Sequence, residues 1–234
     1  MIVQKEAVAL RLPKLDERLK AAADLFPPCS LGADIGTDHG RLPLYLLSED
    51  RCQRMIVADI SLPALLKAKE LITLHQFDHR AIFVQADGLN ALKVPVQAIS
   101  IMGMGGDTMR DILTSGEDKL HGAELILSPH TEIHIVRMAL SDIGYQIIQE
   151  MLTRSGGRFY IIIHAVPGKA VYTEKELLLG PCLIKDRPAL FGAYLRWRQH
   201  VAQKALRAIN ETESKNDDML VWQRLNQYIL EELQ

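Results

Sequence analysis

The first 143 residues alternate between short apolar segments and stretches in which apolar residues recur with helical spacing. The apolar segments are 31–36, 54–60, 80–89, 96–106 and 123–129. The helical stretches are 12–26, 41–49, 62–77, 107–115 and 131–143. Strands that alternate with helices form a parallel sheet with helices on both faces. The pattern predicts a doubly wound, Rossmann-like α/β fold, in which ligands bind outside the carboxyl ends of the strands.

Residues 145–166 have a different pattern. Two β-rich runs flank Ser155-Gly156-Gly157, which is typical of a hairpin turn. We therefore expect an antiparallel hairpin at one edge of the sheet.

The composition changes again after residue 166. Residues 167–181 are predicted to be a connector, and two helices are predicted at 188–210 and 219–233, on either side of a polar break. Two helices joined by a short loop form a helical hairpin. The expected organisation is an α/β domain at 1–170 and a helical hairpin within 171–234.

The turn after the first predicted strand contains an acid and an imidazole where nucleotide-binding folds have a Gly-rich loop. Its sequence is Gly36-Thr37-Asp38-His39-Gly40, which is G-x-x-x-G and not the G-x-G-x-x-G of dinucleotide sites. Thr37 would crowd a pyrophosphate, and Asp38 would repel it. S-adenosylmethionine has no phosphate and carries a sulfonium cation, so an acidic loop suits it. An NAD(P)-dependent oxidoreductase is the weaker alternative.

Acids also occur at the ends of successive predicted strands, at Asp34, Asp59 and Asp87. Asp59 lies 23 positions after Gly36, close to the spacing of an acid that accepts ribose hydroxyls. Asp87, followed by Gly88, suits an adenine amine. The alternative is that these acids only form turns or cap helices, as Asp38 would for a helix beginning near Arg41.

The sequence resembles the bacterial tRNA (adenine-22-N1)-methyltransferases of the TrmK type. The matching segments are LPKLDERLKAAADL, ADIGTDHGRLPLYLL, VQADGLNAL, ISIMGMGGDTMRDIL, LILSP, QEMLTRSGGRFYIII and ELLLGP, in the family's order. The resemblance implies a class I methyltransferase domain, S-adenosylmethionine as cofactor, tRNA as substrate and a C-terminal helical hairpin.

The resemblance also assigns site residues. The cofactor-binding set it implies is Asp34, Gly36, Asp38, His39, Asp59, Ile60, Asp87, Gly88, Gly103, Met104 and Gly105, with Gly106 completing the last loop. One departure is Ser128-Pro129-His130, where the family often has Gln-Pro-Asn. That change motivates a second hypothesis, a methyltransferase fold that binds RNA and has lost turnover.

Adenine N1 is neutral at pH 7 and keeps its lone pair, so no base is needed before methyl transfer. The transfer requires that N1 and the methyl group are held at a short, aligned distance. The product base is cationic, and a nearby carboxylate stabilises it or accepts an N6 proton. Asp38 is the candidate catalytic residue for this role, with His39 orienting it or contacting the base. The target base must be exposed by flipping. Tyr145 and Tyr160 are expected to pack in the core.

Residues 185–207 contain six basic residues and only Asp186 as an acid, a local charge of +5 in a chain of net charge −2. Phosphate contact is the functional interpretation of this patch, and a solvated helix face is the alternative. The residues proposed to contact tRNA are Arg18, Arg187, Arg196, Arg198 and Lys204. Trp197 is expected to pack in the helical hairpin.

Other sequence features predict absences. The three cysteines form no C-x-x-C pair and lie far apart in the sequence, so a disulfide or zinc framework is not expected. His130 and His134 share a helix face but have no evident third ligand, so no metal is expected. No signal peptide or membrane span is expected, since a span needs roughly 20 apolar residues. We expect a cytoplasmic protein that is a monomer or weak homodimer.

Overall fold

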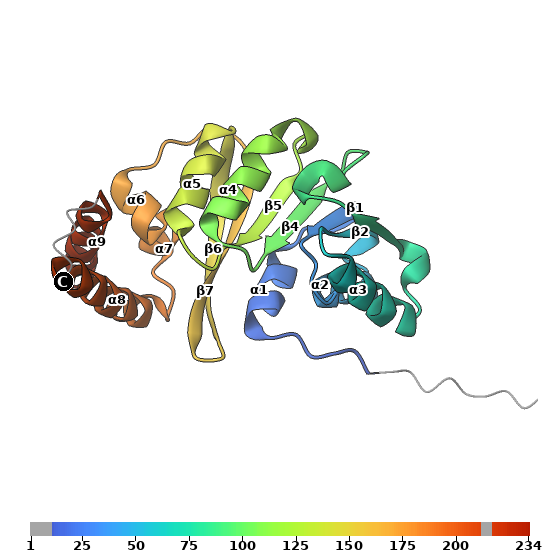
Figure 1. The fold of residues 1–234 in the computed structure, drawn as a ribbon, viewed down its shortest axis with the longest axis horizontal. Helices are drawn as coiled ribbons and strands as arrows, with labels where there is room; N and C mark the ends of the chain where they lie inside the picture. The colour runs from blue at the N-terminus through green and yellow to red at the C-terminus, as the bar shows by residue number, and fades with distance from the viewer. Residues whose placement is uncertain (1–10, 212–216) are drawn as a thin grey trace, which may run out of the picture.

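The computed structural model describes residues 11–211 and 217–234, and in this part of the chain seven strands form one mixed sheet (Figure 1). Its order is β3-β2-β1-β4-β5-β7-β6. The strands are β1 (Cys29–Ile35), β2 (Cys52–Asp59), β3 (Ala81–Gln85), β4 (Ala98–Met102), β5 (Glu124–Ser128), β6 (Tyr145–Ser155) and β7 (Arg158–Pro167). The first five are parallel, and β7 is antiparallel to both β5 and β6. The predicted doubly wound fold with an antiparallel edge is confirmed.

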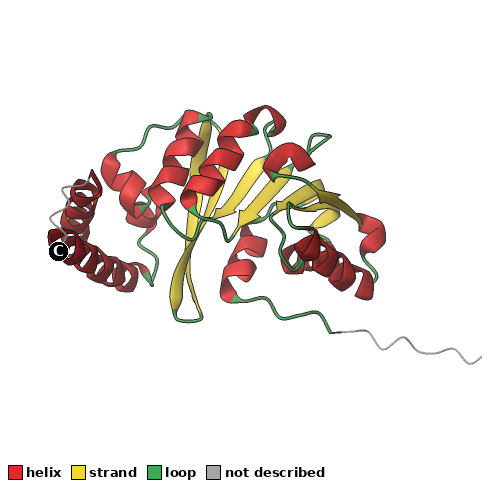
Figure 2. Cartoon of the chain, in the orientation of Figure 1, coloured by secondary structure: helices red, strands yellow, loops and turns green. Residues whose placement is uncertain are grey.

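Helices cover both faces of the sheet (Figure 2). On one face lie α1 (Glu17–Leu25), α2 (Arg41–Ser48) and α3 (Leu62–Leu74), and on the other lie α4 (Gly106–Ser115) and α5 (Ile133–Asp142). Short 3₁₀ helices are η1 (Asp78–Arg80), η2 (Gly88–Ala91) and η3 (Glu117–Lys119). Because side chains alternate along a strand, Met55 and Val57 of β2 pack toward α2 and α3, while Ile56 and Ala58 join the core under α4.

The strand order reverses between β1 and β4. β1 pairs with β2 on one side and with β4 on the other, so the connections leave these strands in opposite directions along the sheet. A reversal of this kind leaves a crevice at the carboxyl ends of the strands. The acidic strand ends identified in the sequence converge at this crevice.

The predicted connector at 167–181 was wrong in one respect, because it contains helical structure. α6 (Glu174–Leu179) begins with a capping box between Thr173 and Glu176, and α7 (Pro181–Asp186) follows Gly180. Each helix is six residues long, too short to show apolar periodicity in the sequence. The third predicted strand was also too long, since β3 ends at Gln85 and η2 follows it.

A buried ion pair joins α6 and α7 to the sheet. Arg137 of α5 donates from Nε to Glu150 Oε1 of β6 at 2.9 Å, and both side chains are fully buried. Arg137 Nη1 donates to the carbonyl of Leu177 at 2.7 Å, and Glu150 Oε2 accepts from the Cys182 amide at 3.1 Å. A Cβ at Gly180 would lie 2.6 Å from Glu150 Oε2, so only glycine fits beside the pair.

The two predicted C-terminal helices are present as α8 (Phe191–Glu211) and α9 (Asp217–Leu233), which pack on each other at one end of the molecule (Figure 1). Their buried residues include Leu195, Ala202, Leu225 and Ile229. Tyr228 of α9 also donates to Glu174 of α6 at 2.9 Å. Residues 212–216 of the predicted polar break lie outside the described part of the chain.

Candidate active site

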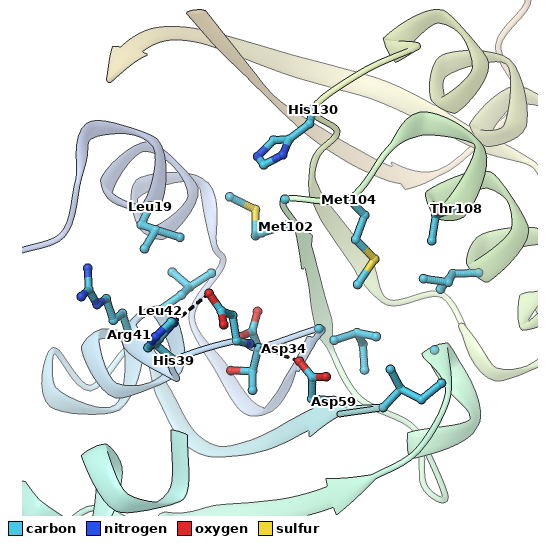
Figure 3. A pocket seen from close by; sticks show the side chains of 18 of the residues that line it. Leu19, Asp34, His39, Arg41, Leu42, Asp59, Met102, Met104, Thr108 and His130 are labelled. Atoms are coloured by element: carbon cyan, nitrogen blue, oxygen red, sulfur yellow. Dashed lines mark hydrogen bonds and ion pairs between the residues drawn. The ribbon is translucent and has the colours of Figure 1, made fainter. Parts of the chain in front are cut away.

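A cavity of about 730 Å³ opens at the crevice (Figure 3). This volume is typical of small-molecule sites. The residues of the predicted cofactor set that line it are Asp34, Gly36, Asp38, His39, Asp59, Ile60, Asp87, Gly88, Gly103 and Met104. Gly105, the remaining member, is the N-cap residue of α4 just beyond the lining. Arg18 and Leu19 of α1 and His130 after β5 also line the cavity, so residues from α1 and from the loops after all five parallel strands are brought to one place.

The turn at 36–40 depends on backbone conformations that glycine favours. Gly36 has φ +74°, and a Cβ there would lie 2.1 Å from the methyl carbon of Met104. Gly40 has φ +67°, and its Cβ would lie 2.8 Å from that of Ala68 on α3. A side chain at Gly40 would push the turn away from the α3 backbone, and a side chain at Gly36 would be strained by the positive φ.

Asp38 also has a positive φ, +51°, and its carboxylate lies 2.7 Å from His39 Nδ1. Its side chain is 74% exposed and borders the cavity. The N-cap of α2 is Gly40, with no side-chain cap. Asp38 therefore does not cap this helix, and its carboxylate and the imidazole are both available to a ligand.

Two backbone amides fix the Asp59 carboxylate at the end of β2. Asp59 Oδ2 accepts from the amide of Asp38 at 3.2 Å, and Oδ1 accepts from that of Ser61 at 2.8 Å. The first bond also joins the end of β2 to the acidic turn (Figure 3). The carboxylate is held in one orientation with lone pairs left to accept from a ligand.

Asp34 lies deeper, at the end of β1, where it is 3% exposed. Ser100 of β4 donates from Oγ to Asp34 Oδ1 at 2.6 Å. Burial raises the pKa of the Asp34 carboxyl, and the Ser100 hydrogen bond opposes that rise. A buried acid with so few partners is typical of a functional site.

The loop between β4 and α4 passes close to the start of α5. Gly103 has φ +77°, and a Cβ at Gly106 would lie 2.4 Å from the carbonyl oxygen of Glu132. The loops after β4 and β5 are also hydrogen-bonded, since the His130 amide donates to the Met104 carbonyl at 2.7 Å. The glycines let two helix starts approach each other at the edge of the cavity.

Arg18, His130 and Tyr160 form a cluster that we call the base-side wall. Arg18 Nη1 donates to His130 Nε2 at 2.9 Å, and its guanidinium carbon lies 5.4 Å from the centre of the Tyr160 ring. The His130 and Tyr160 ring centroids are 5.8 Å apart. Arg18 and His130 line the cavity, and His130 borders it on the side opposite Asp59 in Figure 3.

Partial burial, followed by the charges of Arg18 and Arg158, lowers the pKa of His130. A neutral imidazole has the lone pair that accepts from Arg18. Tyr145 is buried as expected, but Tyr160 is only partly buried and faces this cluster. The sequence singled out Arg18 and His130 separately but could not predict that they meet, because they are 112 positions apart.

The other residues proposed for tRNA contact lie away from the cavity. Arg196 and Lys204 of α8 are exposed, and Arg198 stands over the Tyr194 ring at 5.9 Å. Arg187 forms an ion pair with Glu232 of α9, so part of its charge is compensated.

Two arginines of the β6–β7 hairpin, Arg154 and Arg158, were not among the residues proposed for tRNA contact. Arg154 stands over the Phe159 ring at 5.5 Å, and Arg158 is exposed. Trp197 of α8 lies 5.7 Å from Phe159, so it contacts the β-hairpin and is still 43% exposed. Basic and aromatic side chains are therefore interleaved between α8 and the hairpin.

Within 11–211 and 217–234, no group of three or more His, Cys, Asp or Glu side chains is arranged to hold a metal ion. No helix in these ranges is long and apolar enough to cross a membrane.

The strand order, the antiparallel β7 and the acidic pocket at the reversal define a Rossmann-like class I methyltransferase. A Streptococcus agalactiae protein of the NADB-Rossmann superfamily has the same fold, with a TM-score of 0.87, 26% identity, and coverage of 95% of this chain and 98% of that one. The family model for TrmK, tRNA (adenine(22)-N(1))-methyltransferase, matches residues 32–230, and the chain belongs to this family.

Individual relatives agree with this assignment. The tRNA (adenine(22)-N(1))-methyltransferase of Bacillus subtilis is 32% identical over 196 residues, which cover 80% of this chain and 82% of the relative. The structure of Streptococcus pneumoniae Sp1610 in complex with S-adenosyl-L-methionine has a TM-score of 0.84 and 26% identity, and covers 94% of this chain and all of that one. The resemblance is confirmed, and the oxidoreductase alternative is set aside.

Proposed function

We propose that the cavity is where this S-adenosylmethionine-dependent tRNA methyltransferase holds its methyl donor and receives one adenine, the base at position 22 of tRNA. The observation that carries the proposal is the Asp59 carboxylate, fixed by two backbone amides beside the acidic turn. An oriented acceptor at the end of the second strand is what a ribose diol requires.

The charges around the cavity fit this cofactor. The acids in the lining are Asp16, Asp34, Asp38, Asp59 and Asp87, and the arginines are Arg18 and Arg41. An excess of carboxylates attracts a sulfonium and an ammonium group and repels a pyrophosphate.

We assign each part of the lining a role. Asp59 accepts from the ribose hydroxyls, Asp87 beside Gly88 accepts from the adenine amine, and Ile60 covers the adenosine. The residues for the amino-acid part are Asp34, Gly36, Gly103, Met104 and Gly105.

When bound, S-adenosylmethionine supplies a methyl group on a positively charged sulfur. Transfer of that methyl group to the N1 lone pair would leave the positive charge on the purine. Asp38 stabilises that charge or accepts a proton from N6, and His39 holds the Asp38 carboxylate through their 2.7 Å contact. No base is needed before the attack, so these residues act mainly by positioning.

The target base enters from the base-side wall. The rings of His130 and Tyr160 offer surfaces on which a flipped adenine stacks. Arg18 donates one hydrogen bond to His130, and its other N–H groups can donate to a phosphate of the same nucleotide. In this chain His130 therefore takes the place of the asparagine that is common in the family.

The tRNA body binds along α8. We assign phosphate contacts to Arg196, Arg198 and Lys204, with Arg187 at the margin because of its pairing with Glu232. In this division residues 1–170 hold the cofactor and 171–234 contact tRNA. A tRNA-modifying enzyme acts where tRNA matures, so we place the chain in the cytoplasm. We propose that it is a monomer or weak homodimer.

The decisive experiment incubates the purified chain with methyl-labelled S-adenosylmethionine and tRNA carrying an adenine at position 22, followed by nucleoside analysis. We expect N1-methyladenosine, and none with a control tRNA carrying guanine there. Cofactor binding without methylated product would favour the alternative of a non-catalytic RNA-binding protein.

A further inference from the structure

Cys29 and Cys52, which are far apart in the sequence, are neighbours in the sheet. They are the first residues of β1 and β2, and the strand register pairs them directly. Their Sγ atoms are 2.8 Å apart. Paired residues of adjacent strands are within the Cα separation that a disulfide spans. The two thiols lie at the amino ends of the strands, the edge of the sheet opposite the cavity.

The two thiols are not equivalent. Cys29 is partly exposed, and the hydrogen bond from the Cys52 thiol lowers the pKa of Cys29. Cys52 is fully buried, and the contact with Cys29 together with burial raises its pKa. A partly exposed thiol with a lowered pKa, 2.8 Å from a buried thiol, is the arrangement of an attacking and a resolving cysteine.

The backbone around the pair is fixed. The Cys29 amide donates to the Arg51 carbonyl at 2.9 Å, and Arg80 Nη2 donates to the Cys52 carbonyl at 2.6 Å. The sulfur atoms are therefore held close by the strands and not by a chance loop conformation.

We infer that Cys29 and Cys52 form an oxidation site at which a hydroperoxide closes a reversible intrachain disulfide. The Cys29 thiolate attacks the outer peroxide oxygen, which gives a sulfenic acid on Cys29 and releases an alcohol, or water from hydrogen peroxide. The Cys52 sulfur then attacks Cys29 Sγ, and the hydroxyl group leaves as water with the Cys52 proton. Overall, two thiols and one hydroperoxide give a disulfide, an alcohol and water, and the peroxide takes up the two electrons.

The bond would tie β1 to β2 at the end of the sheet away from Asp34 and Asp59. It closes a loop between positions 23 apart, which restricts the unfolded chain. We therefore expect the oxidised protein to melt at a higher temperature than the reduced protein, by several degrees, and to bind S-adenosylmethionine with unchanged affinity.

The test treats the fully reduced, full-length chain with hydrogen peroxide, blocks remaining thiols and maps the peptides without reduction. We expect one cross-linked peptide pair containing Cys29 and Cys52, which dithiothreitol separates. Cys182 is buried, and burial raises its pKa to about 11, so it should remain a thiol and serve as an internal control.

Two variants sharpen the result. Cys29→Ser, at the partly exposed position, should abolish the cross-link, and Cys182→Ser should not affect it. Cys52→Ala should leave a sulfenic acid on Cys29 that dimedone labels. Full alkylation of Cys29 after peroxide treatment, or a cross-link that includes Cys182, would overturn the inference.

Discussion

At the scale of single residues, the buried carboxyl of Asp34 makes the stability of the folded protein depend on pH. Burial raises its pKa in the folded state above the value in the unfolded chain. The folded state then binds the proton more tightly, so this contribution to stability is complete below the unfolded pKa and is lost as the pH rises through the folded pKa.

The Asp34→Asn variant cannot ionise, and its amide oxygen still accepts from Ser100. We expect its melting temperature, relative to wild type, to rise as the pH increases above the ordinary aspartate pKa of about 4, while cofactor affinity falls. Thermal melts across this range, without cofactor, measure the first effect. Asp118→Asn, at an exposed acid, is the matched control, and a difference that is constant with pH would contradict the assignment.

Asp59 and Asp38 should separate binding from catalysis. Asp59→Ala removes the oriented acceptor and should weaken S-adenosylmethionine binding by about 1–3 kcal/mol, roughly 5- to 150-fold. Asp38→Asn should change affinity little and lower turnover by about 10²-fold, because its carboxylate acts on the developing charge. Calorimetry and single-turnover kinetics measure the two effects, with Asp118→Ala as control. Equal losses of affinity in both variants would refute the division of roles.

At the scale of helices and strands, the close approach of α4 to α5 determines where the loop at 103–105 lies. Gly106→Ala would place a methyl group 2.4 Å from the Glu132 carbonyl oxygen, and we expect a loss of about 1–3 kcal/mol in unfolding free energy together with weaker cofactor binding. Gly192→Ala in α8 has nearest neighbours at 3.7 Å and should be neutral or stabilising. Urea denaturation measures the unfolding free energy of both variants. Similar values would show that the backbone near Glu132 shifts to accommodate the methyl group at little cost.

The buried ion pair between α5 and β6 allows a double-mutant cycle. Arg137→Met should lower the unfolding free energy by about 3–5 kcal/mol, because it leaves Glu150 charged and buried. Arg137→Met combined with Glu150→Leu should be less destabilising than the sum of the two single changes. Chemical denaturation of the four proteins measures the coupling. Simple additivity would show that the two side chains act independently.

At the scale of the whole molecule, charge reversal on α8 tests the tRNA-binding role of the helical hairpin. Arg196→Glu with Lys204→Glu should weaken tRNA binding and reduce the slope of log affinity against log salt by about 1.4–1.8, two phosphate contacts at 0.7–0.9 each. Cofactor affinity should not change. Lys67→Glu with Lys93→Glu makes the same charge change elsewhere on the surface. If the α8 variant keeps the wild-type slope of log affinity against log salt, the helical hairpin has a structural role and does not contact tRNA phosphates.

The division of the chain at residue 170 stays a prediction, and the packing indicates how to test it. Tyr172 accepts from the Ile147 amide, and residues of α6 and α7 hydrogen-bond to Arg137 and Glu150. A cut before Tyr172 would remove these contacts from α6 and α7 and uncover the buried Arg137–Glu150 ion pair. Charge reversal in the full chain therefore separates RNA binding from folding more cleanly than truncation does.

Local patterns in the sequence determined the order of strands and helices, the doubly wound class and the acids at the strand ends. Apolar periodicity and turn residues act between neighbours a few positions apart, so a single sequence displays them. The acids at Asp34, Asp59 and Asp87 could be grouped because parallel strands end at the same edge of a sheet. The GTDHG turn could be predicted for the same reason, because its glycines allow a local backbone conformation.

Tertiary structure alone decided which distant residues meet. The base-side wall joins α1, the loop after β5 and β7, and the Cys29–Cys52 pair follows from the register of β1 on β2. The insertion of β7 between β5 and β6 and the packing of α6 and α7 around Arg137 are of the same kind. Each depends on the register of the strands and the packing of the helices. Many buried contacts together determine that register and packing, and no short stretch of sequence does.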